Sequence, residues 1–283
     1  MILYKQSADL QAHLQKMLSA KPSIGFVPTM GALHEGHISL LKKSKQIADI
    51  TVCSIFINPT QFNNQQDYKK YPETIERDIY LLETNGCDIL FFPDVNEIYP
   101  GGNFKQTPFN LGYLENILEG KYRPGHFQGV CQVVTRLLKI VNPTYLVAGQ
   151  KDYQQCMVLK RLLHLINSAA ELIVCHICRE KDGLAMSSRN LRLNEDERIQ
   201  APAIYEVLLF IQQHIKPGNL KYLKKIAVNF LEKRNFKVDY IEIANTGNLL
   251  TVDEWNGTDE LIILAAAYIN DIRLIDNLKH TVL

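Results

Sequence analysis

The stretch Val27-Pro28-Thr29-Met30-Gly31-Ala32-Leu33-His34-Glu35-Gly36-His37 decides the fold prediction. It follows an apolar run, residues 24–27, that is typical of a buried strand, and it leads into residues 38–44, which have the pattern of an amphipathic helix. A glycine-containing turn between a strand and a helix predicts an anion site, because backbone N–H groups and the positive end of the helix face the ligand. Two histidines three residues apart share a face of a helix. Nucleotide phosphates are therefore the expected ligand.

Short apolar runs alternate with helical patterns over the first two thirds of the chain. The runs cover residues 23–27, 50–57, 88–92, 144–147 and 171–178, and the helical patterns cover 38–48, 72–85, 127–141 and 153–166. Pro72 suits a first helical turn, and Gly86 suits a helix stop. This alternation predicts an α/β fold, a Rossmann-like doubly wound parallel sheet with helices on both faces. Ligands of such sheets bind beyond the carboxyl ends of the strands.

The pattern changes beyond Asn190. Residues 195–215, with Pro202 near the first turns, and residues 220–234 have helical patterns, whereas residues 238–244 and 261–269 have strand character. Two helices and a small sheet predict a smaller α+β C-terminal domain. We therefore expect a Rossmann-like domain over residues 1–184 and a smaller C-terminal domain over residues 185–283.

Composition excludes several classes of protein. The chain has 283 residues, of which 46% are hydrophobic and 22% are charged, and its 31 basic and 30 acidic residues give a formal net charge of +1. A balanced charge argues against binding to nucleic acid or to a membrane surface. No segment has the ~20 consecutive apolar residues of a membrane span, and the N-terminus lacks the features of a signal peptide. The cytoplasm is the expected location.

The six cysteines are expected to be free thiols, buried or half-buried. Cys175 and Cys178 form a C-x-x-C pattern within the apolar run 171–178. Because positions three apart on a strand point to opposite faces, a shared metal ion is not expected there. A zinc site at His34 and His37 is also disfavoured, since the zinc-protease signature needs histidines four apart and no third ligand stands out.

His34-Glu35-Gly36-His37 resembles the His-x-Gly-His signature of the class I aminoacyl-tRNA synthetase and nucleotidyltransferase superfamily. The longer string from Pro28 to His37 resembles the pantothenate synthetase family, also called pantoate–β-alanine ligases. Four further motifs follow in the order of that family, at residues 56–62, 122–127, 149–155 and 182–190, and the similarity ends with Arg273-Leu274-Ile275-Asp276-Asn277. Five ordered motifs are far more specific than one.

This resemblance implies the site residues. It implies catalytic roles for His34, His37 and Lys151. It implies ATP binding by Met30, Gly31, Ala32, Leu33, His34, Glu35, Gly36, His37, Gly149, Gln150, Lys151, Asp152, Cys178, Met186, Ser187, Ser188 and Arg189. It implies pantoate binding by Met30, Asn58, Gln61 and Gln155, with Gln61 also contacting β-alanine. It also implies that the Rossmann-like domain over residues 1–184 binds ATP and pantoate and that the C-terminal domain over residues 185–283 is a lid domain. The family suggests a homodimer.

The resemblance also implies a reaction in two steps. The pantoate carboxylate attacks the α-phosphate of ATP to give pantoyl adenylate and diphosphate, and the β-alanine amine then gives pantothenate and AMP. Mg²⁺ is expected with ATP, without a dedicated protein metal site. Lysine at position 151 can neutralise phosphate charge, and Asp152 can accept a ribose hydroxyl. Arg189 stands where the superfamily's Lys-Met-Ser-Lys-Ser motif has its second lysine.

Two alternatives remain at this stage. A different adenylyl or cytidylyl transferase on the same fold should carry an additional basic site for a phosphorylated acceptor, whereas Gln61 and Gln155 suit a small hydroxy acid. A non-catalytic descendant that binds nucleotide or RNA should lack His37 or Lys151, or should carry a basic stripe.

Overall fold

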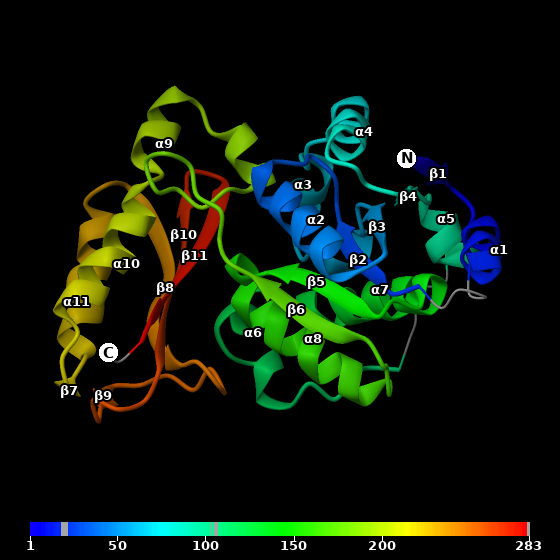
Figure 1. Ribbon diagram of the computed structural model, residues 1–283. Coiled ribbons are helices and arrows are strands. Elements are labelled where there is room, and N and C mark those ends of the chain that lie inside the picture. The colour runs from blue at the N-terminus through cyan, green and yellow to red at the C-terminus, as the bar shows by residue number, and fades with distance from the viewer. Residues whose placement is uncertain (18–21, 103, 105–106, 282–283) are drawn as a thin grey trace. The chain divides into compact units, whose positions relative to one another are not determined.

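The computed structural model describes residues 1–17, 22–102, 104 and 107–281, and its contacts divide the chain into two compact units (Figure 1). The first unit consists of residues 1–150 and 154–176, and the second of residues 151–153 and 177–283. The division therefore falls after His176 rather than after Leu184. The reason is local: Arg179 forms a β-bridge with Ala185 and an ion pair with Asp276, which keep this segment in the second unit.

The first unit contains a parallel sheet of six strands in the order β1-β4-β3-β2-β5-β6. The strands are β1 (Ile2–Tyr4), β2 (Ile24–Thr29), β3 (Ile50–Ile55), β4 (Ile89–Phe91), β5 (Tyr145–Gly149) and β6 (Glu171–Cys175). From β2 the chain adds β3 and β4 in one direction, and from β5 it adds β6 in the other. The order thus reverses between β2 and β5, which pair through Gly25 and Tyr145. In open α/β sheets this reversal marks the ligand crevice.

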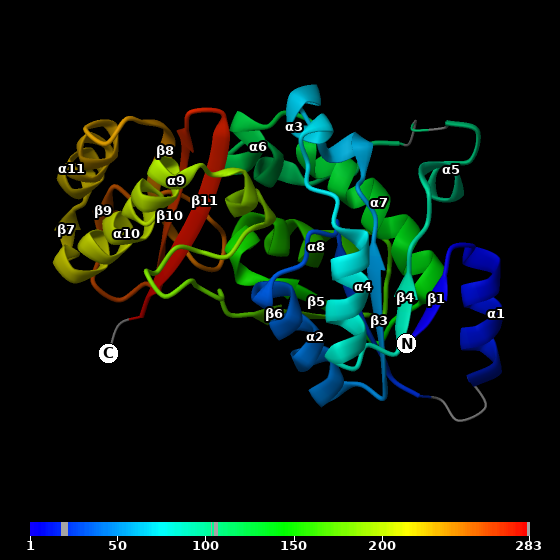
Figure 2. The ribbon, with the colours of Figure 1, turned by 90° about the horizontal axis from the view of Figure 1, so that it is seen from above.

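Helices cover both faces of this sheet, as the alternating pattern predicts. The helices of the first unit are α1 (Ser7–Met17), α2 (Glu35–Ile47), α3 (Gln65–Lys69), α4 (Ile75–Thr84), α5 (Val95–Ile98), α6 (Leu118–Tyr122), α7 (His126–Val141) and α8 (Tyr153–Leu165). Short 3₁₀ turns include η2 (Pro59–Gln61), η4 (Gly112–Glu115) and η5 (Gln150–Asp152). Figure 2 shows α2 and α7 on opposite sides of the sheet, and both helices contact β2.

The second unit is the expected smaller α+β domain. Its main sheet is antiparallel in the order β11-β10-β8, with β8 (Phe236–Asn245), β10 (Leu261–Ile269) and β11 (Ile272–His280). Helices α10 (Ala203–His214) and α11 (Lys221–Glu232) pack on it through an apolar core that includes Leu208, Leu231 and Ile263. Smaller elements are the 3₁₀ turn η6 (Ser188–Arg192), helix α9 (Glu195–Gln200) and the strand pair β7 (Gly218–Asn219) and β9 (Glu254–Trp255).

Several expected boundaries are wrong in detail. The strand expected over residues 171–178 ends at Cys175, so Cys178 lies beyond it. The helix expected over residues 195–215 is two helices, because Pro202 lacks the N–H that would continue the first and stands at the N-cap of the second. Pro72 precedes α4, whose N-cap is Thr74, whereas Gly86 does follow its end with a positive φ of 73°.

The thiols are as expected from the sequence. All six cysteines are free thiols, four of them buried and two, Cys175 and Cys178, half-buried. Within the residues described, no helix is both long and apolar enough to cross a membrane, and no cluster of three or more histidine, cysteine or acidic side chains could hold a metal ion.

Candidate active site

The turn after β2 is held by a buried carboxylate from a distant helix. Gly31 and Ala32 have positive φ angles of 81° and 48°, which leave the backbone N–H groups of the turn pointing toward α4. Asp78 accepts hydrogen bonds from the N–H groups of Ala32 and Leu33, each at 2.8 Å, and from the Thr74 hydroxyl at 3.0 Å. Asp78 is 1% exposed. Asp78 thus fixes the shape of the turn that leads into His34.

The two histidines cap the helix that they begin. His34 is the N-cap of α2, and its Nδ1 accepts the Gly36 N–H at 3.1 Å. The Nδ1 of His37 accepts the His34 N–H at 3.3 Å, and the ring centroids lie 4.1 Å apart. A ring nitrogen that accepts a hydrogen bond carries no proton, so in both neutral rings the proton is on Nε2. The caps therefore make each Nε2 a donor and fix the direction in which it points.

This arrangement corrects one expectation from the sequence. The backbone N–H groups of the turn and the helix start were expected to bind the anion themselves. Instead, those of Ala32 and Leu33 bind Asp78, and those of His34 and Gly36 bind the two imidazoles. Because both Nδ1 atoms accept, each imidazole Nε2 is a donor at this end of α2. The helix dipole still favours negative charge here.

Met30, Asn58 and Gln61 form a cluster beyond the carboxyl ends of the neighbouring strands β2 and β3. The Gln61 Nε2 donates to Met30 Sδ at 2.9 Å, and its Oε1 accepts from Asn58 Nδ2 at 3.1 Å. Asn58 is 1% exposed; its Nδ2 also donates to the Gly129 carbonyl at 3.2 Å, and its Oδ1 accepts from the Tyr99 hydroxyl at 2.8 Å. Asn58 is thus bonded within the protein on all sides, and it orients Gln61.

The motif at residues 122–127 holds the turn η2, which contains Gln61. His126, which is 6% exposed, has its Nδ1 2.8 Å from the Gln61 carbonyl and its Nε2 3.1 Å from Arg123 Nη1. An arginine can only donate, so Nε2 accepts and Nδ1 donates to the carbonyl. Three residues further, Gly129 lies so close to η2 that a Cβ atom would stand 2.2 Å from the Thr60 carbonyl oxygen. The motif therefore holds η2 in place.

Of the two adjacent glutamines on α8, the structure gives one a structural role. Gln154 is 2% exposed, donates to the carbonyls of Leu114 and Ile117, and accepts from the Glu119 N–H at 2.9 Å. Gln155 is half-buried on the first turn of α8, and no hydrogen bond among the described residues joins it to the Met30–Asn58–Gln61 cluster. The cluster therefore contains three of the four predicted pantoate-binding residues.

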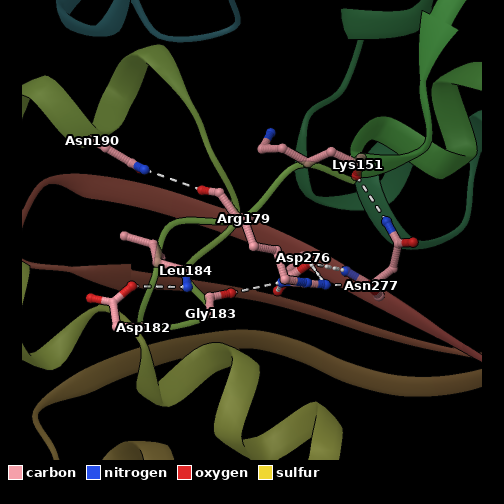
Figure 3. Close-up of polar contacts among 9 residues, drawn as sticks. Lys151, Arg179, Asp182, Gly183, Leu184, Asn190, Asp276 and Asn277 are labelled. Atoms are coloured by element: carbon pink, nitrogen blue, oxygen red, sulfur yellow. Dashed lines mark hydrogen bonds and ion pairs between the residues drawn. The ribbon is translucent and has the colours of Figure 1, made fainter. Parts of the chain in front are cut away.

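The remaining predicted residues belong to the second unit or lead into it. Gly149 ends β5 and Gln150 begins η5, whereas Lys151 and Asp152, whose charged groups lie 3.8 Å apart, are grouped with the second unit. The segment 178–189 folds back on itself: the Met186 N–H donates to the Cys178 carbonyl at 3.0 Å. Figure 3 shows the Lys151 side chain extending away from Asn277, which holds the Lys151 backbone.

Ser187, Ser188 and Arg189 lie at the start of η6. The Ser187 hydroxyl oxygen accepts the Arg189 N–H at 3.3 Å. The side chain of Asn190, labelled in Figure 3, donates through Nδ2 to the Ala185 carbonyl at 3.1 Å. Ser188 is 6% exposed. These bonds order the backbone around Ser187 and Arg189.

A family model described as pantoate-beta-alanine ligase matches residues 2–279. This chain belongs to the pantoate–β-alanine ligase family. It is a ligase of pantothenate biosynthesis, as the five sequence motifs predict.

Relatives of this ligase family match along their whole length. The chain is 43% identical to a pantothenate synthetase from Cytophaga hutchinsonii over 98% of the chain and 99% of the relative. It is 41% identical to that of Flavobacterium psychrophilum over 99% of both chains. Among solved structures it resembles the pantothenate synthetase from Thermus thermophilus, with 37% identity, a TM-score of 0.88 and coverage of 99% and 100%. These matches confirm the predicted fold class.

A further solved relative carries ligands. The pantoate–β-alanine ligase from Francisella tularensis, complexed with β,γ ATP and β-alanine, is 39% identical, with a TM-score of 0.81 and coverage of 98% of this chain and 97% of that one.

Three residues that hold the proposed binding segments in place were not predicted from the sequence: Asp78, Tyr99 and Gln154. Only Asp78 carried a signal in the sequence. It stands at the third position after Ile75 on an apolar face of α4 that also includes Ile79 and Leu82. A single acidic residue on such a face requires a hydrogen-bonding partner, because a buried charge is costly without one.

Proposed function

We propose that the protein condenses (R)-pantoate with β-alanine through a pantoyl-adenylate intermediate. The pantoate carboxylate oxygen attacks the α-phosphorus of ATP, and diphosphate leaves. The β-alanine amine then attacks the acyl carbon, AMP leaves with the bonding electrons, and the amine loses a proton. Both nucleophiles come from substrates, so the protein contributes mainly position and fixed charge.

The observation that carries this proposal is the reciprocal capping by His34 and His37. It commits both Nδ1 atoms to backbone N–H groups, so that each neutral ring holds its proton on Nε2. Two preoriented donors at the positive end of α2 suit the charge that develops on phosphate oxygens during adenylation. We propose that the residues that form this turn and the start of α2 also contact ATP: Met30, Gly31, Ala32, Leu33, Glu35 and Gly36.

The proposed pantoate site is the Met30–Asn58–Gln61 cluster, with Gln155. Gln61 Nε2 donates to a thioether, which is a weak acceptor. A carboxylate or hydroxyl of pantoate is a better partner, so substrate binding exchanges a weak hydrogen bond for a stronger one. We propose that Asn58 acts by orienting Gln61, that Met30 contacts the pantoate methyl groups, and that Gln61 later contacts β-alanine.

The segments 149–152 and 178–189 are proposed to provide the remaining contacts with ATP. Lys151 neutralises phosphate charge, Asp152 accepts a ribose hydroxyl, and Ser187, Ser188 and Arg189 donate to the triphosphate. Gly149, Gln150, Cys178 and Met186 shape the adenosine side of the site. Mg²⁺ enters as part of the substrate, bound to ATP phosphates, which suits an ion that keeps most of its water ligands and needs few from protein.

We further propose that the second unit acts as a lid that shields the adenylate from water, and that the protein is a cytoplasmic homodimer. The family supports the dimer. Sedimentation velocity distinguishes it from a monomer, since the single chain has a mass of 32.4 kDa.

Isotope exchange between ATP and diphosphate tests the two-step scheme. We expect exchange that requires pantoate and proceeds without β-alanine, and AMP formation that requires both. Exchange that depends on β-alanine, or that proceeds without pantoate, contradicts the adenylate intermediate. Gln61→Ala serves as a site control: it should weaken pantoate binding far more than ATP binding, because truncation leaves polar groups of pantoate without partners.

A further inference from the structure

Two neighbouring residues of β11 hold both segments of the second unit that carry proposed ATP contacts. Asp276 binds Arg179, near the start of the folded-back segment 178–189, and Asn277 binds the backbone of Lys151 (Figure 3). Asp276 is 4% exposed and Asn277 is 2% exposed. Neither residue belongs to the proposed set of substrate contacts.

Asp276 forms a bidentate ion pair with Arg179. Arg179 Nη1 and Nη2 donate to the two carboxylate oxygens at 2.6 and 3.0 Å. The same guanidinium donates to the carbonyls of Gly183 and Asn277 at 3.0 and 3.2 Å, and its carbon lies 3.8 Å from the centre of the Tyr205 ring. Gly183 has φ +90°, and a Cβ atom there would lie 2.2 Å from Tyr205. The segment that leads to Ser187 and Ser188 is thus fixed against both β11 and α10.

The Asn277 side is a single hydrogen bond with a defined direction. Asn277 Nδ2 donates to the Lys151 carbonyl at 2.9 Å. Adjacent residues of a strand point to opposite faces. Asp276 alternates with Leu274 on the face that packs on the helices, so Asn277 projects from the other face. One dipeptide thereby anchors two segments through the two faces of one strand.

Stability alone does not explain such a pair, because apolar residues of similar volume often replace a buried ion pair without loss. Its geometry instead fixes position. We propose that Asp276 and Asn277 are positioning residues, which set the placement of the Lys151 ammonium relative to Ser187, Ser188 and Arg189 for adenylation. This inference rests on the proposed function, since it assumes that both segments contact ATP.

Asn277→Asp is the sharpest test on the Lys151 side. It keeps the shape of the side chain and replaces the donor by an acceptor facing the Lys151 carbonyl. We expect the kcat of pantoate-dependent ATP–diphosphate exchange to fall on the order of 10- to 100-fold, as for a catalytic group displaced by about 1 Å. The Kd for pantoate should stay within twofold, because Met30, Asn58 and Gln61 belong to the first unit.

A double-mutant cycle separates positioning from general damage. If Asn277 acts through Lys151, Asn277→Asp should have little further effect on exchange in a Lys151→Ala background. Full additivity of the two losses overturns the inference. If Lys151→Ala leaves exchange unchanged, the proposed function of Lys151 fails. If Lys151→Ala lowers exchange and Asn277→Asp does not, the inference alone fails.

Arg179→Lys provides the second variant if Asn277→Asp does not fold. It keeps the positive charge and loses the planar fork that binds both carboxylate oxygens. We expect it to lower exchange and to lose this effect in a Ser188→Ala background. The control is Asp239→Asn, which removes the negative charge from the 2.7 Å ion pair between Asp239 of β8 and Arg273 of β11. That variant should keep exchange within twofold; an equal loss of exchange in the control overturns the positioning role.

Discussion

Each of the two histidines caps helix α2 and is also proposed to donate a hydrogen bond to phosphate. The two roles use different ring nitrogens. Nδ1 binds a backbone N–H in both rings. A substitution can therefore remove one role and keep the other, which makes this pair a sensitive place to test the mechanism.

His34→Asn should separate capping from catalysis. Asparagine is among the best N-cap residues, whereas alanine loses about 1 kcal/mol of stability at such a position. We expect His34→Asn to unfold at nearly the wild-type urea concentration and His34→Ala to unfold earlier. Both should lower single-turnover adenylate formation by about 10²–10³, the usual cost of one preorganised donor. Wild-type adenylate formation by His34→Asn contradicts a donor role for His34.

Asp78 should contribute strongly to the free energy of unfolding, although it is far along the chain from the turn that it holds. Asp78→Ala removes the partner of two N–H groups, those of Ala32 and Leu33. We expect a loss of roughly 2–5 kcal/mol in the free energy of unfolding, because a buried donor without a partner costs about 1–3 kcal/mol. Asp94→Ala, at the exposed N-cap of α5, should cost only about 1 kcal/mol. Equal losses in the two variants, measured by urea unfolding, contradict this role for Asp78.

At the scale of elements, the proposed pantoate cluster depends on the contact between α7 and η2. Asn58 and Thr60 both donate to the Gly129 carbonyl, and no side chain fits between Gly129 and the Thr60 backbone. A glycine inside a helix costs about 1 kcal/mol relative to alanine, so close approach of the two backbones is the physical reason for glycine here.

Gly129→Ala should displace η2 and weaken pantoate binding at least tenfold, with a smaller effect on ATP binding, because Gln61 moves with its turn. Thr135→Val on the same helix is the matched control. The Thr135 hydroxyl is buried and has no hydrogen-bond partner among the described residues, so its removal should leave pantoate binding and stability unchanged or slightly improve stability. Titration calorimetry with pantoate measures both variants; unchanged affinity in Gly129→Ala contradicts the role of the contact.

The sequence predicted the elements whose patterns are strong and local. Five parallel strands, β2 to β6, are confirmed, as are α2, α7 and β10, because each is a continuous apolar run or a clear amphipathic helix. β1 was missed because two of its three residues are exposed, whereas β4, of the same length, is fully buried. β11 was missed because Arg273, Asp276 and Asn277 interrupt its alternation. Those polar residues bind distant partners, and contacts between residues far apart in the chain leave no periodic signal in a sequence.

The same limit applied to the candidate site. The segments that carry the motifs were predicted, and the structure brings Met30, Asn58 and Gln61 together. The buried residues that hold these segments, such as Asp78 and Gln154, stand in helices far along the chain from the turns that they support. Their hydrogen-bond partners can be identified only from the folded structure.

Across the whole molecule, the thiols should fall into two groups by reactivity. Cys53, Cys87, Cys131 and Cys156 are at most 6% exposed, and burial raises the pKa of Cys87 and of Cys131 to about 12. The thiolate is the reactive form, so a disulfide reagent at about pH 8 should modify at most Cys175 and Cys178 in the native protein and all six in denaturant. Mass spectrometry of the labelled peptides counts the sites; rapid native labelling of Cys131 contradicts the burial of this thiol.

The division of proposed site residues between two units leads to the last prediction. The histidines and the pantoate cluster belong to the first unit, whereas Lys151 and Ser187–Arg189 belong to the second. If the second unit acts as a lid, binding of ATP and pantoate together should draw the units into a more compact arrangement, because one triphosphate then bridges donors on both. Small-angle X-ray scattering should show a smaller radius of gyration with both substrates than with pantoate alone. Lys151→Ala should weaken this change, since it removes one of the charges that the second unit presents. An unchanged radius in the wild-type protein, with adenylate formation confirmed in the same sample, contradicts closure: the second unit then contributes charge without moving.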